Sequence, residues 1–153
     1  MRFCARAANP LSMAQTYEQD TNKSLLLKLI EEGFNKGVLS VVDEVVSPES
    51  REHQRGNRDG RDGTKEVIST LRTWFPDFQM RAEDVVAVGD MVWARFKATG
   101  TNLGAVMHMP PTGKKMSIDV IDIVRFKDGR IVEHWGVPDQ LGMMLQLGII
   151  GNR

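Results

Sequence analysis

Two strand-like runs joined by an Asp-Gly turn constrain the fold of this chain more than any other feature. Apolar and polar residues alternate over Met116–Phe126 and again over Arg130–Trp135, which is the pattern of strands with one buried face. Lys127-Asp128-Gly129 stands between them, and Asp-Gly favours the type I′ turn that joins antiparallel strands. We therefore predict a β-hairpin over residues 116–135.

A second pair of strands precedes this hairpin. Residues 78–88 and 91–101 are rich in strand-forming residues and meet at the turn pair Gly89-Asp90. Residues 102–115, between the two pairs, are rich in glycine and proline, which predicts a loop. The second half of the chain is therefore predicted to form an antiparallel sheet.

The first half has the periodicity of helices. Apolar residues recur at helical spacing over residues 20–36, 39–46 and 67–74, while residues 49–64 are predicted as a polar surface loop. Apolar residues at helical spacing also predict a short C-terminal helix over residues 139–147. Helices followed by strands predict an α+β fold, with a curved antiparallel sheet wrapped on three N-terminal helices. The open end of such a sheet is a natural site for a small molecule.

Composition narrows the classes of function. The chain has 153 residues, which suits a single domain with one core, and we interpret residues 20–150 as that domain. Twenty basic and twenty acidic residues cancel, so charge gives no support for nucleic-acid binding. No run approaches the roughly 18 apolar residues of a membrane span. We therefore expect neither a nucleic-acid nor a membrane partner.

Residues 1–19 are interpreted as a flexible leader. Met1–Ser12 contains arginine but no acidic residue, and it lacks the apolar run of a secretory signal. We therefore favour Met13 as the true start of the protein and a cytoplasmic location. Cys4 is the only cysteine, which excludes an internal disulfide and argues against a cysteine metal site.

Motifs in the C-terminal half resemble a known family. Met109-Pro110-Pro111-Thr112-Gly113 is followed by residues 122–135 (DIVRFKDGRIVEHW), then by Asp139-Gln140-Leu141-Gly142 and Gln146-Leu147-Gly148. In this order they resemble the SnoaL-like polyketide cyclases, and among these the ester cyclases. The resemblance covers roughly residues 23–148, with similar upstream residues at 75–78 and at Gly100-Thr101.

The resemblance implies the nuclear transport factor 2-like fold, a cone of curved sheet closed by three helices, assembled as a homodimer or homotetramer. It implies an apolar pocket for a hydrophobic polyketide ester, with no metal and no organic cofactor. In the family's cyclases an acidic residue moves a proton during an intramolecular aldol closure. We therefore predict a cofactor-independent acid–base enzyme of the cyclase or isomerase type. The alternatives are a non-catalytic small-molecule-binding or dimerisation module and a cofactor-free hydroxylase.

Asp122 is the first candidate for proton transfer. It shares a predicted strand face with Ile118, Val120, Val124 and Phe126. A carboxylate among such residues is costly without a partner or a role, and apolar surroundings can raise the pKa of a carboxyl toward neutrality. The alternative is a buried acid that a neighbouring arginine or tyrosine holds for structural reasons.

His134 and Asp139 are further catalytic candidates. The resemblance places the catalytic aspartate of the family's aldol cyclases at Gly136, which has no side chain. His134 lies two residues earlier on the same strand face, where it could act as a base with a pKa near neutrality or as a structural histidine. Asp139 matches a family aspartate at the entry to the last helix, a position that also suits an N-cap.

Other residues are candidates for the pocket wall or for contacts between subunits. The three histidines fall on separate elements without a short ligand spacing, so a zinc site is not expected. Trp93 suits a core or oligomer face, and Arg95 and Arg125 suit salt bridges across the sheet or between subunits. For Trp74 and Phe75 the alternative is a place in the core, and for His53 and His108 it is a position in a surface loop. The candidates for substrate binding are His53, Trp74, Phe75, His108, Met109, Val120 and Val124.

Overall fold

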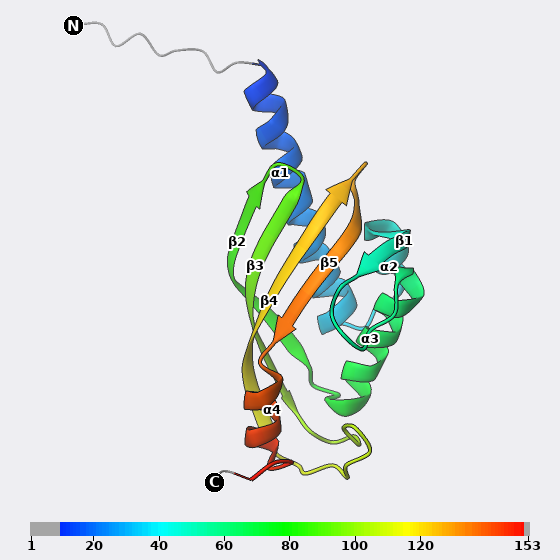
Figure 1. The fold of residues 1–153 in the computed structure, drawn as a ribbon, viewed down its shortest axis with the longest axis vertical. Coiled ribbons are helices and arrows are strands. Elements are labelled where there is room, and N and C mark those ends of the chain that lie inside the picture. The colour runs from blue at the N-terminus through cyan, green and yellow to red at the C-terminus, as the bar shows by residue number, and fades with distance from the viewer. Residues whose placement is uncertain (1–9, 152–153) are drawn as a thin grey trace, which may run out of the picture.

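The computed structural model describes residues 10–151 as helices packed on one face of a curved sheet (Figure 1). Among these residues no helix combines the length and the apolar character needed to cross a membrane. In chain order the elements are α1 (Pro10–Lys28), the π-helical η1 (Leu29–Asn35), α2 (Ser40–Val45), β1 (Val46–Glu52), α3 (Gly60–Trp74), β2 (Gln79–Val88), β3 (Met91–Thr101), β4 (Lys115–Lys127), β5 (Arg130–Pro138) and α4 (Gln140–Leu147).

The described strands form one mixed sheet in the order β1-β5-β4-β3-β2. The pairs from β2 to β5 are antiparallel, as the sequence predicts. The predicted hairpin is confirmed, because Lys127 pairs with Arg130 across a turn in which Asp128 and Gly129 have φ angles of 51° and 71°. Two consecutive positive φ angles are the signature of the type I′ turn.

Strand β1 corrects the sequence prediction at the edge of the sheet. Val46 was expected in a helix and residues 49–64 in a loop, yet Val46–Glu52 forms a strand parallel to β5. Its sequence after Val46 is polar, and only Val46 and Ser50 in it are buried. Such an edge strand has no apolar alternation, so its pairing depends on contacts distant in sequence.

The first helix begins earlier than predicted. It was expected from about Asp20, but α1 starts at Pro10, so residues 10–19 of the predicted leader are helical. Met13 and Tyr17 in these first turns are exposed, and the turns extend past the sheet (Figure 1). Residues 1–9, which include Cys4, lie outside the described part of the chain.

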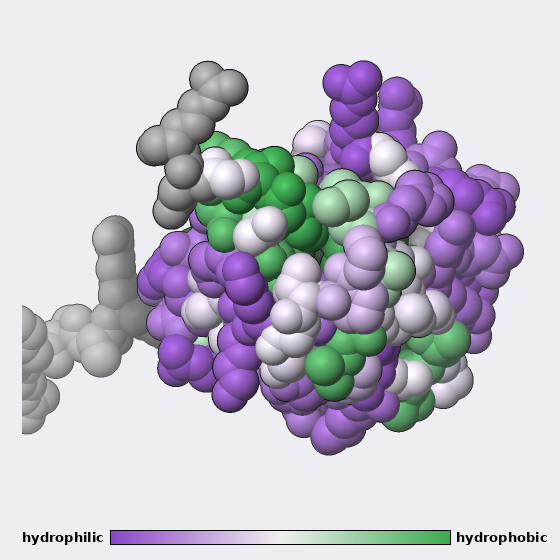
Figure 2. Space-filling view, turned by 90° about the horizontal axis from the view of Figure 1, so that it is seen from below, coloured by the Kyte–Doolittle hydropathy of each residue, from purple (hydrophilic) through white to green (hydrophobic). Residues whose placement is uncertain are grey.

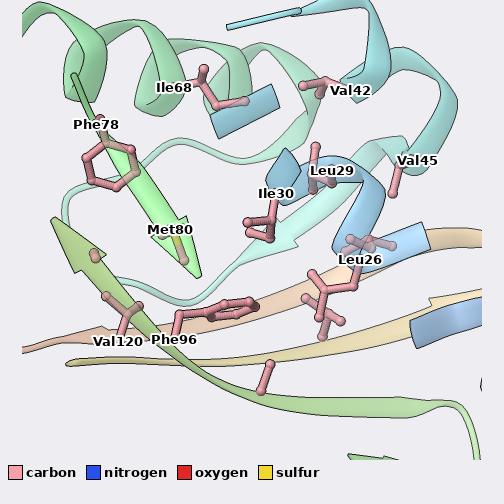
Figure 3. Close-up of a cluster of buried hydrophobic side chains, with 14 of the residues drawn as sticks. Leu26, Leu29, Ile30, Val42, Val45, Ile68, Phe78, Met80, Phe96 and Val120 are labelled. Atoms are coloured by element: carbon pink, nitrogen blue, oxygen red, sulfur yellow. The ribbon is translucent and has the colours of Figure 1, made fainter. Parts of the chain in front are cut away.

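The core lies between the helices and the concave face of the sheet. Ile30 of η1 points toward Phe96 of the sheet, whereas Leu29 points toward Ile68 of α3 (Figure 3). Burying one such leucine or phenylalanine contributes roughly 1.5–3 kcal/mol. Part of this core also lines a space between the helices and the sheet. The labelled members of the cluster are Leu26, Leu29, Ile30, Val42, Val45, Ile68, Phe78, Met80, Phe96 and Val120.

Asn102 organises the loop that carries the Pro-Pro-Thr-Gly run. This fully buried side chain accepts hydrogen bonds from the backbone N–H and the hydroxyl of Thr112, and it donates to the carbonyl oxygens of Gly104 and Trp74. Asp77 similarly accepts from the N–H and hydroxyl of Thr101. These contacts tie the loop to the end of α3. They give structural roles to Thr112 of the Pro-Pro-Thr-Gly run and to Thr101 of the Gly100-Thr101 pair.

The C-terminal end of the molecule has a mixed surface. Figure 2 views the face that carries α4 and shows an apolar patch surrounded by polar side chains. Leu141 of α4 is exposed, and Ile149 and Ile150 are partly buried there. Directly after α4, Gly148 caps the helix in the left-handed conformation with a φ of 72°.

Candidate functional site

A cavity of about 410 Å³ opens between the concave face of the sheet, η1 and α3. Inward-facing positions of β4 form one wall, since alternate residues of this strand are buried. Most of the lined surface is apolar, and polar side chains interrupt it, most of them from β1, the β1–α3 connection and α3. The apolar lining includes Leu29, Phe34, Leu71, Trp74, Met116, Ile118, Val120, Val124 and Met143.

Three titratable side chains form a row on the cavity wall. His134 lies in the middle, with its Nδ1 2.8 Å from Oε2 of Glu52 and its Nε2 3.3 Å from Oδ1 of Asp122. The side chains of Asp122 and Glu52 are each 12% exposed and that of His134 is 24% exposed. All three line the mainly apolar cavity, whose other charged lining residues are Arg51, Arg55, Arg58 and Glu66.

Sheet register brings this row together. Glu52 is the last residue of β1 and pairs with His134 of β5. On the other side, β4 pairs Val124 with His134 and Asp122 with Gly136, so Asp122 lies diagonally across from the histidine. Three neighbouring strands therefore each contribute one residue of the Asp122–His134–Glu52 row.

The two carboxylates determine the charge of His134. Burial by itself lowers the pKa of the imidazole, but hydrogen bonds to Asp122 and Glu52, together with their negative charges, raise it to about 10. At neutral pH the ring is therefore an imidazolium that donates from both nitrogens. This geometry does not support the expected role of His134 as a base with a pKa near neutrality.

Asp122 retains a free acceptor atom. Both oxygens of Glu52 are used, since Oε1 accepts the backbone N–H of Gln54 at 2.7 Å and Oε2 accepts from His134. Only Oδ1 of Asp122 is bound, by His134, and Oδ2 has no hydrogen-bond partner among the described residues. Of the two carboxylates, Asp122 is thus the one that can accept a proton from a molecule in the cavity.

The expected pocket residues divide into two groups. Trp74, Val120 and Val124 line the cavity with Asp122 and His134. Phe75, His53, His108 and Met109 do not line it. The side chain of Phe75 is fully buried and packs where a Cβ on Gly100 would fall. His108 and Met109 are exposed in the loop after β3, and Met107 of that loop reaches the lining instead.

Two other candidates have partners outside the cavity. His53 stacks on Trp135, with ring centroids 4.5 Å apart, and its Nε2 lies 3.3 Å from Oε2 of Glu133. Asp139 caps α4, where its Oδ1 accepts the backbone N–H of Gly142 at 2.8 Å. The N-cap role considered for Asp139 is present, and its side chain does not line the cavity.

Glu52 and Gln54 are the site residues that the sequence analysis missed. Both belong to the polar stretch interpreted as a surface loop, and no periodicity marks either of them. Only the parallel pairing of β1 with β5 brings Glu52 to His134. Within residues 10–151 no three His, Cys, Asp or Glu side chains are grouped so as to hold a metal ion.

The comparisons with known proteins agree with this fold. The family model for SnoaL-like polyketide cyclase matches residues 24–147, and the chain belongs to this family. Nogalonic acid methyl ester cyclase of Streptomyces nogalater is 30% identical over 122 residues, covering 75% of this chain and 89% of the relative.

Two solved structures show the same architecture. Wild-type IdmH from Streptomyces antibioticus is 32% identical to this chain, with a TM-score of 0.74, and the match covers 83% of this chain and 98% of that one. TsrD from Streptomyces laurentii is 26% identical to this chain, with a TM-score of 0.80, and the match covers 86% of this chain and 98% of that one. The predicted family and α+β fold are therefore confirmed.

Proposed function

We propose that this protein closes a ring in a hydrophobic polyketide ester by an intramolecular aldol reaction, with Asp122 as the proton-transfer group. The observation that carries the proposal is the free Oδ2 of Asp122 in a mainly apolar cavity of about 410 Å³. Family membership and the relative that acts on nogalonic acid methyl ester support the same substrate class. The reaction needs an acid–base group rather than a redox step.

The proton follows a closed path in this proposal. Asp122 Oδ2 removes a proton from the carbon next to a substrate carbonyl, and the resulting enolate carbon forms a bond to a second carbonyl carbon. The oxygen of that second carbonyl takes up the electron pair as an alkoxide. Asp122, now neutral, returns the proton to the alkoxide, so the product has the composition of the substrate.

His134 keeps Asp122 ready for this step. The imidazolium of His134 donates to Oδ1 of Asp122 at 3.3 Å, which fixes the position of the carboxylate and leaves its second oxygen free. Glu52, 2.8 Å from the other ring nitrogen, holds the imidazolium in place.

Product mass tests the reaction type directly. Incubating the protein with nogalonic acid methyl ester should give a new compound of unchanged mass, because aldol closure only rearranges atoms. A product heavier by one oxygen atom, lost under anaerobic conditions, would identify a hydroxylase instead. Binding of the ester without any product would identify a binding module.

We also propose that the outer face of the sheet binds a second copy of the chain, in a homodimer or homotetramer. Val86, Trp93, Ile123 and Trp135 are register partners across four strands and form an apolar row on that face. Trp93 in this row is 50% exposed. An exposed tryptophan among apolar neighbours is typical of a protein interface.

A further inference from the structure

Gln54 places an unpaired carboxamide in the cavity beside the Asp122–His134–Glu52 row. The residue follows β1, is partly buried and lines the cavity. Its backbone N–H donates to Oε1 of Glu52 at 2.7 Å, so the carboxylate that holds His134 also holds the backbone of Gln54. No hydrogen bond joins the side-chain amide of Gln54 to any described residue.

The missing side chain of Gly136 makes room for this carboxamide. Gly136 lies in β5 opposite Asp122, and it is not among the glycines with a positive φ, so its backbone does not require glycine. A Cβ added there would collide with Oε1 of Gln54, and it would lie 3.2 Å from Cδ of Gln54 and 2.9 Å from Cε1 of His134. The space is therefore occupied by Gln54, next to the imidazolium.

The row itself offers no free donor to a substrate. Both N–H groups of His134 are engaged by Asp122 and Glu52, and ionised carboxylates only accept hydrogen bonds. During ring closure, however, negative charge develops on the oxygen of the carbonyl that is attacked. A donor placed beside that oxygen lowers the barrier because its interaction strengthens as the charge grows.

We propose that Gln54 is this donor, a further catalytic residue whose amide N–H binds the carbonyl oxygen that becomes the alkoxide. The inference rests on the proposed cyclase function and assigns a second role at the same site. It also explains Gly136 in physical terms, because any side chain at that position displaces the Gln54 carboxamide from His134. The ligand group it selects is a neutral ketone or ester carbonyl.

A double-mutant cycle on Gln54 and Gly136 tests the assignment. We expect Gln54→Ala and Gly136→Ala each to lower kcat/KM for nogalonic acid methyl ester roughly 100-fold, the loss typical of one removed donor. The double variant should lose no more than either single one, because both changes remove the same interaction. The matched control Gln79→Ala, exposed on β2, should stay within about twofold of the wild type. Wild-type kcat/KM in Gln54→Ala would overturn the inference.

A second measurement is independent of turnover. The side-chain ¹⁵N–¹H signals of Gln54 are identified by their absence in Gln54→Ala and then followed in the Asp122→Asn protein as the ester is added. We expect the Gln54 signals to shift while those of Gln79 stay in place. Ester binding with unmoved Gln54 signals would overturn the inference, and so would absence of binding. If the Gln54 signals shift but the wild-type protein gives no product from the ester, Gln54 is supported as a carbonyl-binding residue and the proposed cyclase function is refuted.

Discussion

Glu52 and His134 are register partners on the parallel strands β1 and β5, and their side chains meet at 2.8 Å. This contact connects the edge strand to the acid–base site. Asp122 completes the row from β4, 3.3 Å from the other nitrogen of the ring. The edge strand is therefore part of the site as well as of the fold.

The ionisation of His134 should depend on Glu52. Glu52→Gln removes one of the two carboxylates that hold the imidazolium, so the pKa of His134 should fall below its value of about 10. Titration of the imidazole nitrogens by NMR measures this directly. Glu133→Gln, which alters the partner of His53, is the matched control and should leave the pKa of His134 unchanged. Equal titration curves in the wild type and Glu52→Gln would contradict the proposed row.

Stability should depend on pH through the same histidine. The folded pKa of His134 is raised from 6.5 to about 10, so its contribution is fully present below pH 6.5 and is lost as pH rises toward 10. We expect His134→Gln to be less stable than the wild type by about 3 kcal/mol near pH 6.5, and the difference to shrink toward pH 10. Urea unfolding at several pH values gives the difference. A gap independent of pH would show that the imidazole is neutral in the fold.

Two buried asparagines should differ in their effect on stability. Asn102 makes four side-chain hydrogen bonds, whereas Nδ2 of the equally buried Asn22 has no partner. Asn102→Ala should lower the free energy of unfolding by about 3 kcal/mol and Asn22→Ala by clearly less, because unsatisfied groups remain only in the first case. Thermal or urea unfolding compares the two variants. Equal losses would mean that Asn102 does not hold the loop.

The proposed assembly should depend on the outer face of the sheet. Trp93→Glu introduces a charge into the apolar row and should convert an oligomer into a monomer without loss of fold. Val38→Glu is a suitable control because Val38 is also an exposed apolar residue but lies in the connection between η1 and α2. Sedimentation equilibrium distinguishes the masses. A monomeric wild type would remove this proposal.

Local patterns in the sequence are enough to predict the central sheet. The Asp128-Gly129 turn and the alternation along β4 depend on neighbouring residues only, and so does the inward direction of Asp122. The family motifs correctly indicated the fold for the same reason: they mark turns and close contacts within the C-terminal half. The sequence also shows glycine at position 136, where the family resemblance places a catalytic aspartate.

The remaining parts of the site depend on contacts distant in sequence. Strand β1 is polar and lies at an edge, so its pairing with β5 leaves no periodic signal. As a result neither Glu52 nor Gln54 could be recognised, although Gln54 occupies the space that Gly136 leaves. The charge of His134 was missed as well, because it follows from two carboxylates on different strands.

The most direct test of the account is the turnover of nogalonic acid methyl ester by Asp122→Asn. Asparagine has nearly the same shape but cannot accept the proton, so we expect kcat to fall by roughly 10²–10⁴-fold with the fold retained. Asp119→Asn, on the outer face of the same strand and paired with Lys97, should retain wild-type activity. Wild-type turnover in Asp122→Asn would contradict the central claim.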